Sequence, residues 1–174
     1  MRRVVAGLVA GLVVGMGLGT TALRAQWVTP PVLSLSAGQM RYTMSNTRTG
    51  TLVALRLASP IVPLGRRNWL LEPGAAYVWY RADDGSRRHL FVPEVQVQLQ
   101  VGPPGIQPYV GVGGGLATTR VDTVRTTKLT ASAAAGLRLL LGGWGIAGEL
   151  RVRSLSLFQG TTRELTVSLF RKLE

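Results

Sequence analysis

The sequence predicts an all-β protein, an eight-stranded antiparallel sheet closed into an up-and-down barrel. Three observations support this fold class. Apolar and polar residues alternate in one run after another, as they do in a strand whose two faces meet different surroundings. Turn-forming residues separate the runs, and every connection between them is short. Large polar side chains are spaced so that small residues would face them on the neighbouring strand.

The chain begins with a segment typical of secreted proteins. Two arginines precede an apolar run over Val4–Gly19, and small residues follow up to Ala25. This order predicts a cleaved signal peptide over residues 1–25, followed by a short lead-in over residues 26–32. A transmembrane anchor helix is the alternative, but the run is shorter than the ~20 residues that a span needs and is rich in glycine.

Residues 33–174 are expected to form the barrel, because eight alternating runs follow one another there without a helical period. The expected strands are Leu33–Met44, Gly50–Ala58, Asn68–Arg81, His89–Val101, Ile106–Thr118, Lys128–Leu141, Trp144–Leu157 and Arg163–Lys172. The breaks between them read, in order, SNTRT, SPIVPLGRR, ADDGSRR, GPPG, TRVDTVRTT, GG and FQGTT. Short breaks favour hairpins between consecutive strands, and closure into a barrel satisfies both edges of such a sheet.

The Gly142-Gly143 turn sets the pairing of the strands on either side of it. A two-residue turn places Leu141 opposite Trp144, and the face that these two share is apolar throughout. On the other face each charged residue meets a small one: Glu149 with Gly136, Arg151 with Ala134 and Arg153 with Ser132. The stretch PEVQVQLQVGPPGIQPYVGVGGG repeats this arrangement. Across its turn we expect Gln96 opposite Gly111, Glu94 opposite Gly113, Val97 opposite Val110 and Leu99 opposite Pro108.

This matching of volumes predicts which face points inward. Small residues opposite large ones are needed in a confined space, and the interior of an eight-stranded barrel is just wide enough for side chains. The polar face is therefore expected to line the lumen and the aliphatic face to form the outside, which is the arrangement of a transmembrane β-barrel. The alternative is a secreted, soluble, lipocalin-like barrel, which needs an apolar interior and a polar exterior.

The expected lumen contains charged and amide side chains on several strands. Its members are Arg56, Glu72, Glu94, Gln96, Gln98, Gln100, Arg138, Glu149, Arg151 and Arg153. Arg138 would lie opposite Ala147 and therefore diagonal to Glu149. Buried charges persist only when they are paired, so we expect a plugged interior of Arg–Glu and Gln contacts. A narrow channel, or a site for a small anionic ligand that uses the excess arginines, is the alternative.

Aromatic residues gather near the expected strand ends, as in the girdles that mark both interfaces of outer-membrane barrels. The girdle is predicted to contain Tyr42, Trp69, Trp79, Tyr80, Phe91, Trp144 and Phe158. With both termini in the periplasm, Trp69 and Trp144 fall at the inner interface and the others at the outer one. Because successive side chains of a strand point to opposite faces, the positions of Tyr109 and Phe170 place them on the lumen side.

The amino-acid composition argues against several kinds of functional site. The chain has no cysteine and a single histidine, His89, so we expect no metal site, no cofactor and no catalytic residue. The segment DDGSRRH around Ser86 and His89 is foremost a turn. The formal net charge is +12. Because arginines gather at the expected outer strand ends and loops, anionic lipopolysaccharide is a simpler partner for them than nucleic acid.

Three segments resemble small bacterial outer-membrane β-barrel proteins of the OmpA/OmpX type: PEVQVQLQVGPPGIQPYVGVGGGL, LTASAAAGLRLLLGGWGIAGELRVRSL and RELTVSLFRKL. The resemblance covers most of the chain from Leu33 onward. It implies a monomer in the outer membrane, contact with lipid and lipopolysaccharide, and the help of the outer-membrane insertion machinery. It also implies a closing strand with an aromatic near its end, and apolar residues where Thr166 and Ser168 stand. We expect a structural or surface-interaction role in the cell envelope.

Overall fold

The fold is described by a computed structural model over residues 30–43, 47–64, 67–81, 85–103, 105–121, 124–155 and 160–173. The expected signal peptide over residues 1–25 and the expected girdle residue Phe158 lie outside these ranges.

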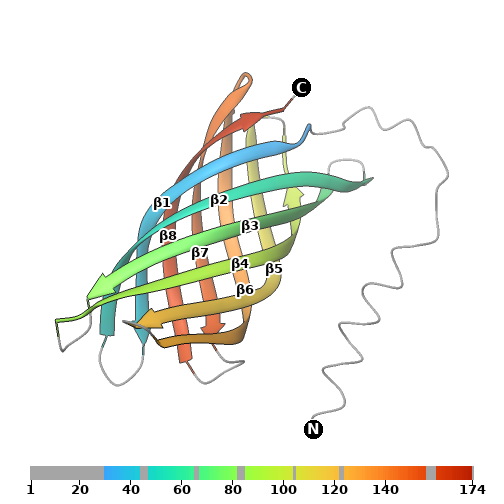
Figure 1. Ribbon diagram of the computed structural model, residues 1–174. Coiled ribbons are helices and arrows are strands. Elements are labelled where there is room, and N and C mark those ends of the chain that lie inside the picture. The colour runs from blue at the N-terminus through green and yellow to red at the C-terminus, as the bar shows by residue number, and fades with distance from the viewer. Residues whose placement is uncertain are drawn as a thin grey trace, which may run out of the picture.

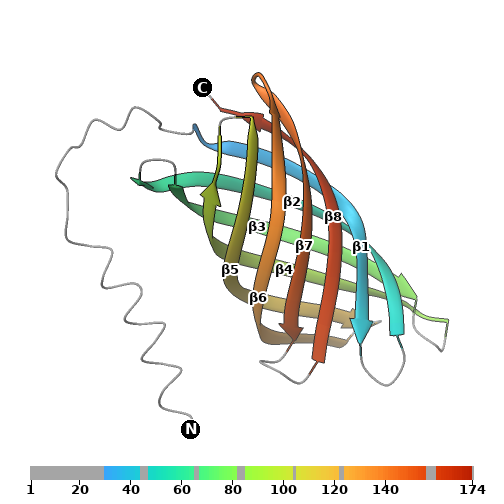
Figure 2. The ribbon, with the colours of Figure 1, turned by 180° about the vertical axis from the view of Figure 1, so that it is seen from behind.

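Eight antiparallel strands form one closed barrel, as the sequence predicts (Figures 1 and 2). The strands are β1 (Val32–Thr43), β2 (Thr47–Leu64), β3 (Arg67–Arg81), β4 (Arg87–Val101), β5 (Ile106–Val121), β6 (Val124–Leu141), β7 (Trp144–Leu155) and β8 (Gly160–Lys172). Each strand pairs with its neighbours in sequence, and β1 pairs with β8 to close the sheet from Val32↔Lys172 to Thr43↔Thr161. Closure leaves no strand edge unpaired.

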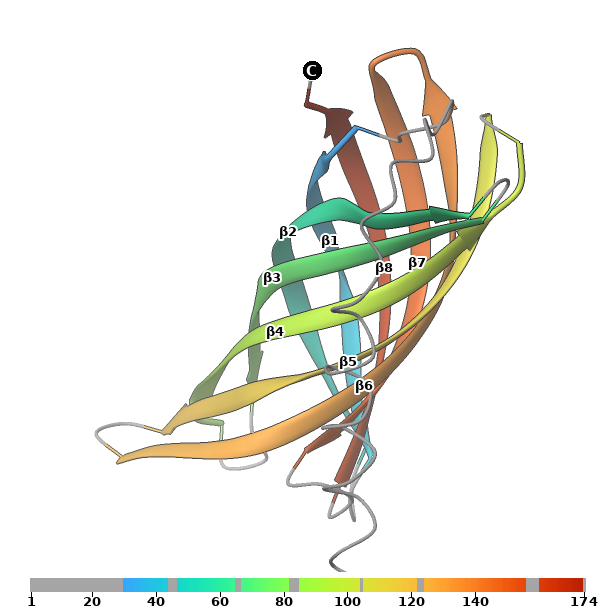
Figure 3. The ribbon, with the colours of Figure 1, turned by 90° about the vertical axis from the view of Figure 1, so that its right-hand side faces the viewer.

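The barrel has two distinct ends. The start of β1 and the end of β8 lie together with the β6–β7 turn (Figure 1), and we call this the terminal end. The connections β1–β2, β3–β4, β5–β6 and β7–β8 lie at the opposite end, which we call the loop end. Figure 3 shows β5 and β6 extending between the two ends at a marked tilt, which strands adopt when a sheet closes into a barrel.

Several strands are longer than the sequence predicts, β2 and β6 by the most residues. β2 continues to Leu64 instead of ending at Ala58, and its pairing with β3 shifts by one residue between Pro60 and Val62. The prolines of SPIVPLGRR therefore lie within a strand, at a bulge, where a residue without an N–H is tolerated. β6 begins at Val124, four positions before the expected start.

The register of β4 and β5 differs from the expected one by two residues. Gln98 faces Gly111, Gln96 faces Gly113 and Glu94 faces Gly115, while Leu99 faces Val110 and Val97 faces Val112. In the expected register Gln98 would have faced the Tyr109 ring. A shift of two keeps every side chain on its own face, and it places three successive long polar side chains opposite glycines. A Cβ atom on Gly111 would lie only 2.9 Å from Cδ of Gln96.

The β6–β7 register is the one that the sequence predicts. Leu141 faces Trp144, and Glu149, Arg151 and Arg153 face Gly136, Ala134 and Ser132. Gly142 has a φ of 71°, a value that a residue without a Cβ adopts readily in a two-residue turn.

The outside of the barrel is apolar. Residues such as Leu35, Val112, Leu150 and Val167 are more than half exposed, and they alternate with buried residues along their strands. The soluble lipocalin-like alternative is therefore wrong, because it requires a polar exterior. On β8, Thr166 and Ser168 are buried in the interior while the apolar residues between them face outward. The apolar residues that the resemblance implies at these two positions are therefore wrong, because Thr166 and Ser168 share the inward face of Phe170 and the outward positions are Leu165, Val167 and Leu169.

The interior is not polar along its whole length, which the sequence analysis did not anticipate. One buried apolar cluster lies toward the loop end and contains Met40, Leu52, Ala54, Ala76, Val78, Leu90, Val92 and Ala117. A second lies toward the terminal end and contains Val32, Ala58, Leu70, Ala147 and Phe170. We call them the loop-end cluster and the terminal-end cluster. Polar side chains fill the space between them.

Candidate functional site

Among the residues that the structure describes, eight charged side chains are buried together in the interior. They are Arg56, Arg138, Arg151 and Arg153 with Glu72, Glu94, Glu149 and Glu164, each less than a tenth exposed. Four positive charges therefore meet four negative ones, and the interior is balanced without any bound ion. The balance matters because an uncompensated buried charge is costly.

These charges form one continuous chain in which arginine and glutamate alternate. At the loop-end side, Arg153 Nε donates to Glu164 Oε1 at 2.8 Å, and Arg153 Nη1 lies 3.0 Å from Glu94 Oε2 as an ion pair rather than a hydrogen bond. Arg151 then pairs with Glu94 through Nη1. Arg151 also donates from Nε to Glu149 Oε1 at 2.9 Å. Each arginine thus joins carboxylates from different strands.

The chain continues toward the terminal end. Arg56 Nη1 lies 3.4 Å from Glu149 Oε1, and Arg56 Nε lies 3.9 Å from Glu72 Oε1. Arg138 Nη2 donates to Glu72 Oε2 at 3.0 Å. Arg151 Nη2 lies 3.6 Å from Glu72 Oε1, which closes the chain into a network. The network crosses the barrel, since β2, β3, β4, β6, β7 and β8 all contribute to it.

Amides and one phenol complete the contacts. Arg138 donates to Gln98 Oε1 at 2.7 Å and to Gln100 Oε1 at 2.9 Å, and its guanidinium lies 4.5 Å from the centroid of the Tyr109 ring. The Tyr109 hydroxyl donates to Glu149 Oε2 at 2.8 Å. Gln96 Oε1 accepts from Gln98 at 2.8 Å and from Arg151 at 3.1 Å. The alternating amides of β4 are therefore acceptors for arginine N–H groups.

The structure places all ten expected lumen residues in the interior, but it changes two details. Arg138 does lie opposite Ala147, yet its ion-pair partner is Glu72 on β3 and not the diagonal Glu149. Glu164 was missed, although it shares the inward parity of Thr162 and Thr166 on the same strand. Without Glu164 the interior would contain an excess of arginine, which is the excess that suggested an anionic ligand.

The expected aromatic girdle is only partly on the outer wall. Trp79, Phe91 and Trp144 face outward with exposed fractions of 41%, 43% and 50%. Trp69 pairs with the outward-facing Leu99 and is partly buried. Tyr42 and Tyr80 were assigned wrongly, because both pack against the loop-end cluster inside the barrel. Tyr77 joins the outer wall instead, 40% exposed and tilted against Trp79 at 6.1 Å between ring centroids.

In the part of the chain that the structure describes, no group of His, Cys, Asp and Glu could hold a metal ion. Among the same residues, no helix is long and apolar enough to span a membrane. His89 makes a 2.7 Å hydrogen bond with the Tyr77 hydroxyl through Nδ1, on the outer wall. Asp83 and Asp84, its neighbours in sequence, lie outside the described residues.

The barrel is similar to solved outer-membrane structures. Neisserial surface protein A matches with a TM-score of 0.63 and 10% identity, over 82% of this chain and 97% of that one. The outer membrane enzyme PagL matches with a TM-score of 0.58 and 12% identity, over 82% and 99%. Ail, the attachment invasion locus protein of Yersinia pestis, matches with a TM-score of 0.54 and 12% identity, over 83% and 99%. No family model and no curated protein matches the sequence.

These likenesses define the class of fold, that of the small eight-stranded outer-membrane β-barrels, and confirm at this level the resemblance that the sequence predicts. Because the sequence identities are only 10–12%, these similarities show the fold and nothing about the activity. Because one of these neighbours is an enzyme, the fold is compatible with catalysis as well as with non-enzymatic roles.

Proposed function

We propose that this protein is an integral β-barrel of the bacterial outer membrane with a sealed interior, and that it has a structural or surface-interaction role in the cell envelope. The observation that carries the proposal is the charge-balanced interior. Its arginines and glutamates neutralise one another, and apolar clusters lie on both sides of them. Such an interior supports a stabilised wall and a lumen that is closed to ions.

The outer wall supports insertion in a lipid bilayer. Leu35, Val112 and Val167 are 62–65% exposed on three different strands, and large apolar side chains are exposed on every strand around the barrel. Exposed apolar surface of this extent is costly in water and favourable in hydrocarbon. We therefore propose that lipid surrounds the wall. We also propose that the barrel is a monomer.

The arginines outside the interior support an orientation with both termini in the periplasm. Arg41, Arg81, Arg87, Arg120 and Arg163 are exposed near the loop end. In this orientation they would lie at the outer surface, among anionic lipopolysaccharide headgroups. After secretion the chain would be inserted by the outer-membrane insertion machinery.

Fractionation of cells tests the location. The mature chain should be extracted from the outer membrane only by detergent, should resist washing with carbonate or urea, and should migrate differently on a gel before and after boiling. Recovery as a freely soluble periplasmic protein would contradict the proposal.

A further inference from the structure

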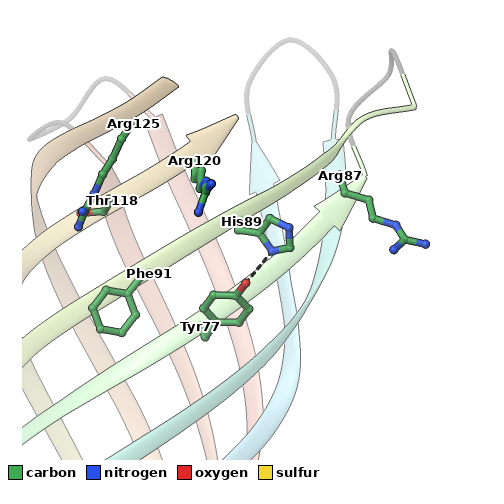
Figure 4. A pocket seen from close by; sticks show the side chains of 7 residues that line it. All are labelled: Tyr77, Arg87, His89, Phe91, Thr118, Arg120 and Arg125. Atoms are coloured by element: carbon green, nitrogen blue, oxygen red, sulfur yellow. Dashed lines mark hydrogen bonds between the residues drawn. The ribbon is translucent and has the colours of Figure 1, made fainter. Parts of the chain in front are cut away.

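A groove on the outer wall lies where β3–β6 approach the loop end (Figure 4). It has a volume of about 620 Å³ and is lined by Tyr77, Arg87, His89, Phe91, Thr118, Arg120 and Arg125. We call it the outer-wall groove. Among the described residues that line it, three of seven are arginines and none is acidic. Since it faces outward, it is separate from the charged interior.

The strand registers order the groove and its surroundings into rows. One row close to the loop end contains Trp79, His89, Arg120 and Arg125, which face one another in turn across four strands. The next row contains Tyr77, Phe91, Thr118 and Thr127. Further from the loop end lie Leu116 and Leu129, which face each other and are 45% and 57% exposed. The side chains therefore become less polar with distance from the loop end: cationic residues come first, then aromatic and hydroxyl-bearing residues, and then leucines.

The two rows are held in place by contacts within the wall. The Tyr77 hydroxyl bonds His89 at 2.7 Å, and the Tyr77 and His89 rings lie 5.7 Å apart. The Thr118 and Thr127 hydroxyls are 3.0 Å apart. Tyr77 and Phe91 stay about two-fifths exposed, so each keeps an open ring surface beside the arginines.

Like charges face each other at this end of the sheet. Arg81 is the register partner of Arg87, and Arg120 is the partner of Arg125. Positive charge is therefore concentrated in this part of the wall, which favours an anionic ligand there. The acidic residues of the two connections, Asp83, Asp84 and Asp122, lie outside the described residues.

We propose that the outer-wall groove binds the phosphorylated headgroup of an outer-leaflet lipid. This inference rests on the proposed membrane location. Arg120 and Arg125, which are register partners, would hold the phosphate, while Tyr77 and Phe91 contact the adjoining sugar or glycerol. Arg87 points away from these two arginines in Figure 4 and adds positive charge at the edge of the groove. The exposed Leu116 and Leu129 point to a lipid rather than a free anion, because they continue the site with a surface for an acyl chain.

Lipid titration of the purified, folded barrel in nonionic detergent, followed by native mass spectrometry, tests this inference. The probes are diphosphorylated lipid A, the same lipid after dephosphorylation, and inorganic phosphate. The wild type should retain the phosphorylated lipid in preference to both others. Arg120→Gln with Arg125→Gln should weaken its binding about tenfold through the loss of charge-assisted contacts. Phe91→Ala should weaken lipid binding without changing the response to inorganic phosphate.

The matched control is Arg41→Gln with Arg163→Gln. These arginines also face each other near the loop end, and removing them costs the same two charges, but they lie on β1 and β8 away from the groove. This variant should bind the phosphorylated lipid as the wild type does. An equal loss in both double variants, equal retention of the dephosphorylated lipid, or binding of inorganic phosphate as strong as that of the lipid would overturn the inference.

For every variant and every probe, the migration of an unboiled sample on a gel shows whether the protein is folded. Failure of the wild type to be recovered from the outer membrane contradicts the proposed function itself. A folded, membrane-derived wild type that shows no preference for the phosphorylated lipid contradicts only the groove's assignment.

Discussion

Arg151 on β7 forms an ion pair with Glu94 on β4, so the two residues join strands that are three positions apart around the barrel. Both side chains are buried, and Arg151 is 1% exposed. Arg151 also reaches Glu149 on its own strand and Glu72 on β3. Ion pairs across the interior therefore connect strands that are not neighbours, in addition to the backbone hydrogen bonds between neighbouring strands.

Removal of the Glu94 charge should destabilise the barrel strongly. Glu94→Gln keeps the shape of the side chain but leaves Arg151 and Arg153 short of one carboxylate. The free energy of unfolding should fall by about 3–5 kcal/mol, because a buried arginine is left uncompensated. Urea titration of the barrel in lipid vesicles measures this. Glu94→Gln combined with Arg151→Met should recover part of the loss. If Glu94→Gln is as stable as the wild type, the interior is more hydrated than we propose.

Arginine on the outer wall should be costly in proportion to its depth. Leu150 lies in the middle of β7 and is 54% exposed, whereas Leu141 lies at the end of β6 and is 69% exposed. Leu150→Arg should cost about 2–4 kcal/mol of unfolding free energy and Leu141→Arg about 0–1 kcal/mol. The same urea titration compares them. Equal costs would mean that the middle of the wall does not lie in hydrocarbon.

One glycine inside the barrel is required by a neighbouring ring. A Cβ atom on Gly145 would overlap the Phe170 ring in the terminal-end cluster, whereas a Cβ on Gly148 would meet nothing within 4 Å. Gly145→Ala should lower the unfolding free energy by about 1–3 kcal/mol through overpacking. Gly148→Ala, three positions along the same strand, should be tolerated. Similar stabilities for the two variants would disprove the packing of Phe170.

Two buried threonines on β8 should respond differently to loss of the hydroxyl. Thr166 Oγ1 has no hydrogen-bond partner among the residues described, while Thr162 Oγ1 donates to Glu164 Oε1 at 3.4 Å. Thr166→Val should be neutral or raise the unfolding free energy by about 1 kcal/mol, and Thr162→Val should lower it by about 1 kcal/mol. Thermal unfolding in detergent ranks the two, and the reverse ranking would contradict the interior contacts.

Local pattern was sufficient to predict the number of strands, their order and the facing of most side chains. Parity is a property of each strand alone, so Gln96 and Arg151 could be assigned to the interior without knowing the barrel. The turn between Val101 and Ile106 does not determine the register of β4 and β5, because two registers that differ by two residues place every side chain on the same face. The sequence predicts the end of β2 before Pro60, because proline is uncommon within strands, but a bulge accommodates Pro60 there.

Contacts across the barrel could not be predicted from sequence. The pairing of Arg138 with Glu72 joins β6 to β3, and only closure of the sheet brings these strands face to face. Leu52 and Leu90 also share the inward parity, but the polar residues were the more visible signal of the lumen. The two apolar clusters were missed for this reason, as was the inward position of Tyr80.

Planar-bilayer recording of the refolded wild-type protein tests the sealed interior most directly. We predict no steady conductance from protein whose folding is verified on an unboiled gel, because we propose that the Arg–Glu network and the two apolar clusters seal the lumen. Steady conductance from the wild type, abolished or differently rectified in Arg151→Ala, would contradict this account and show that the interior is a channel.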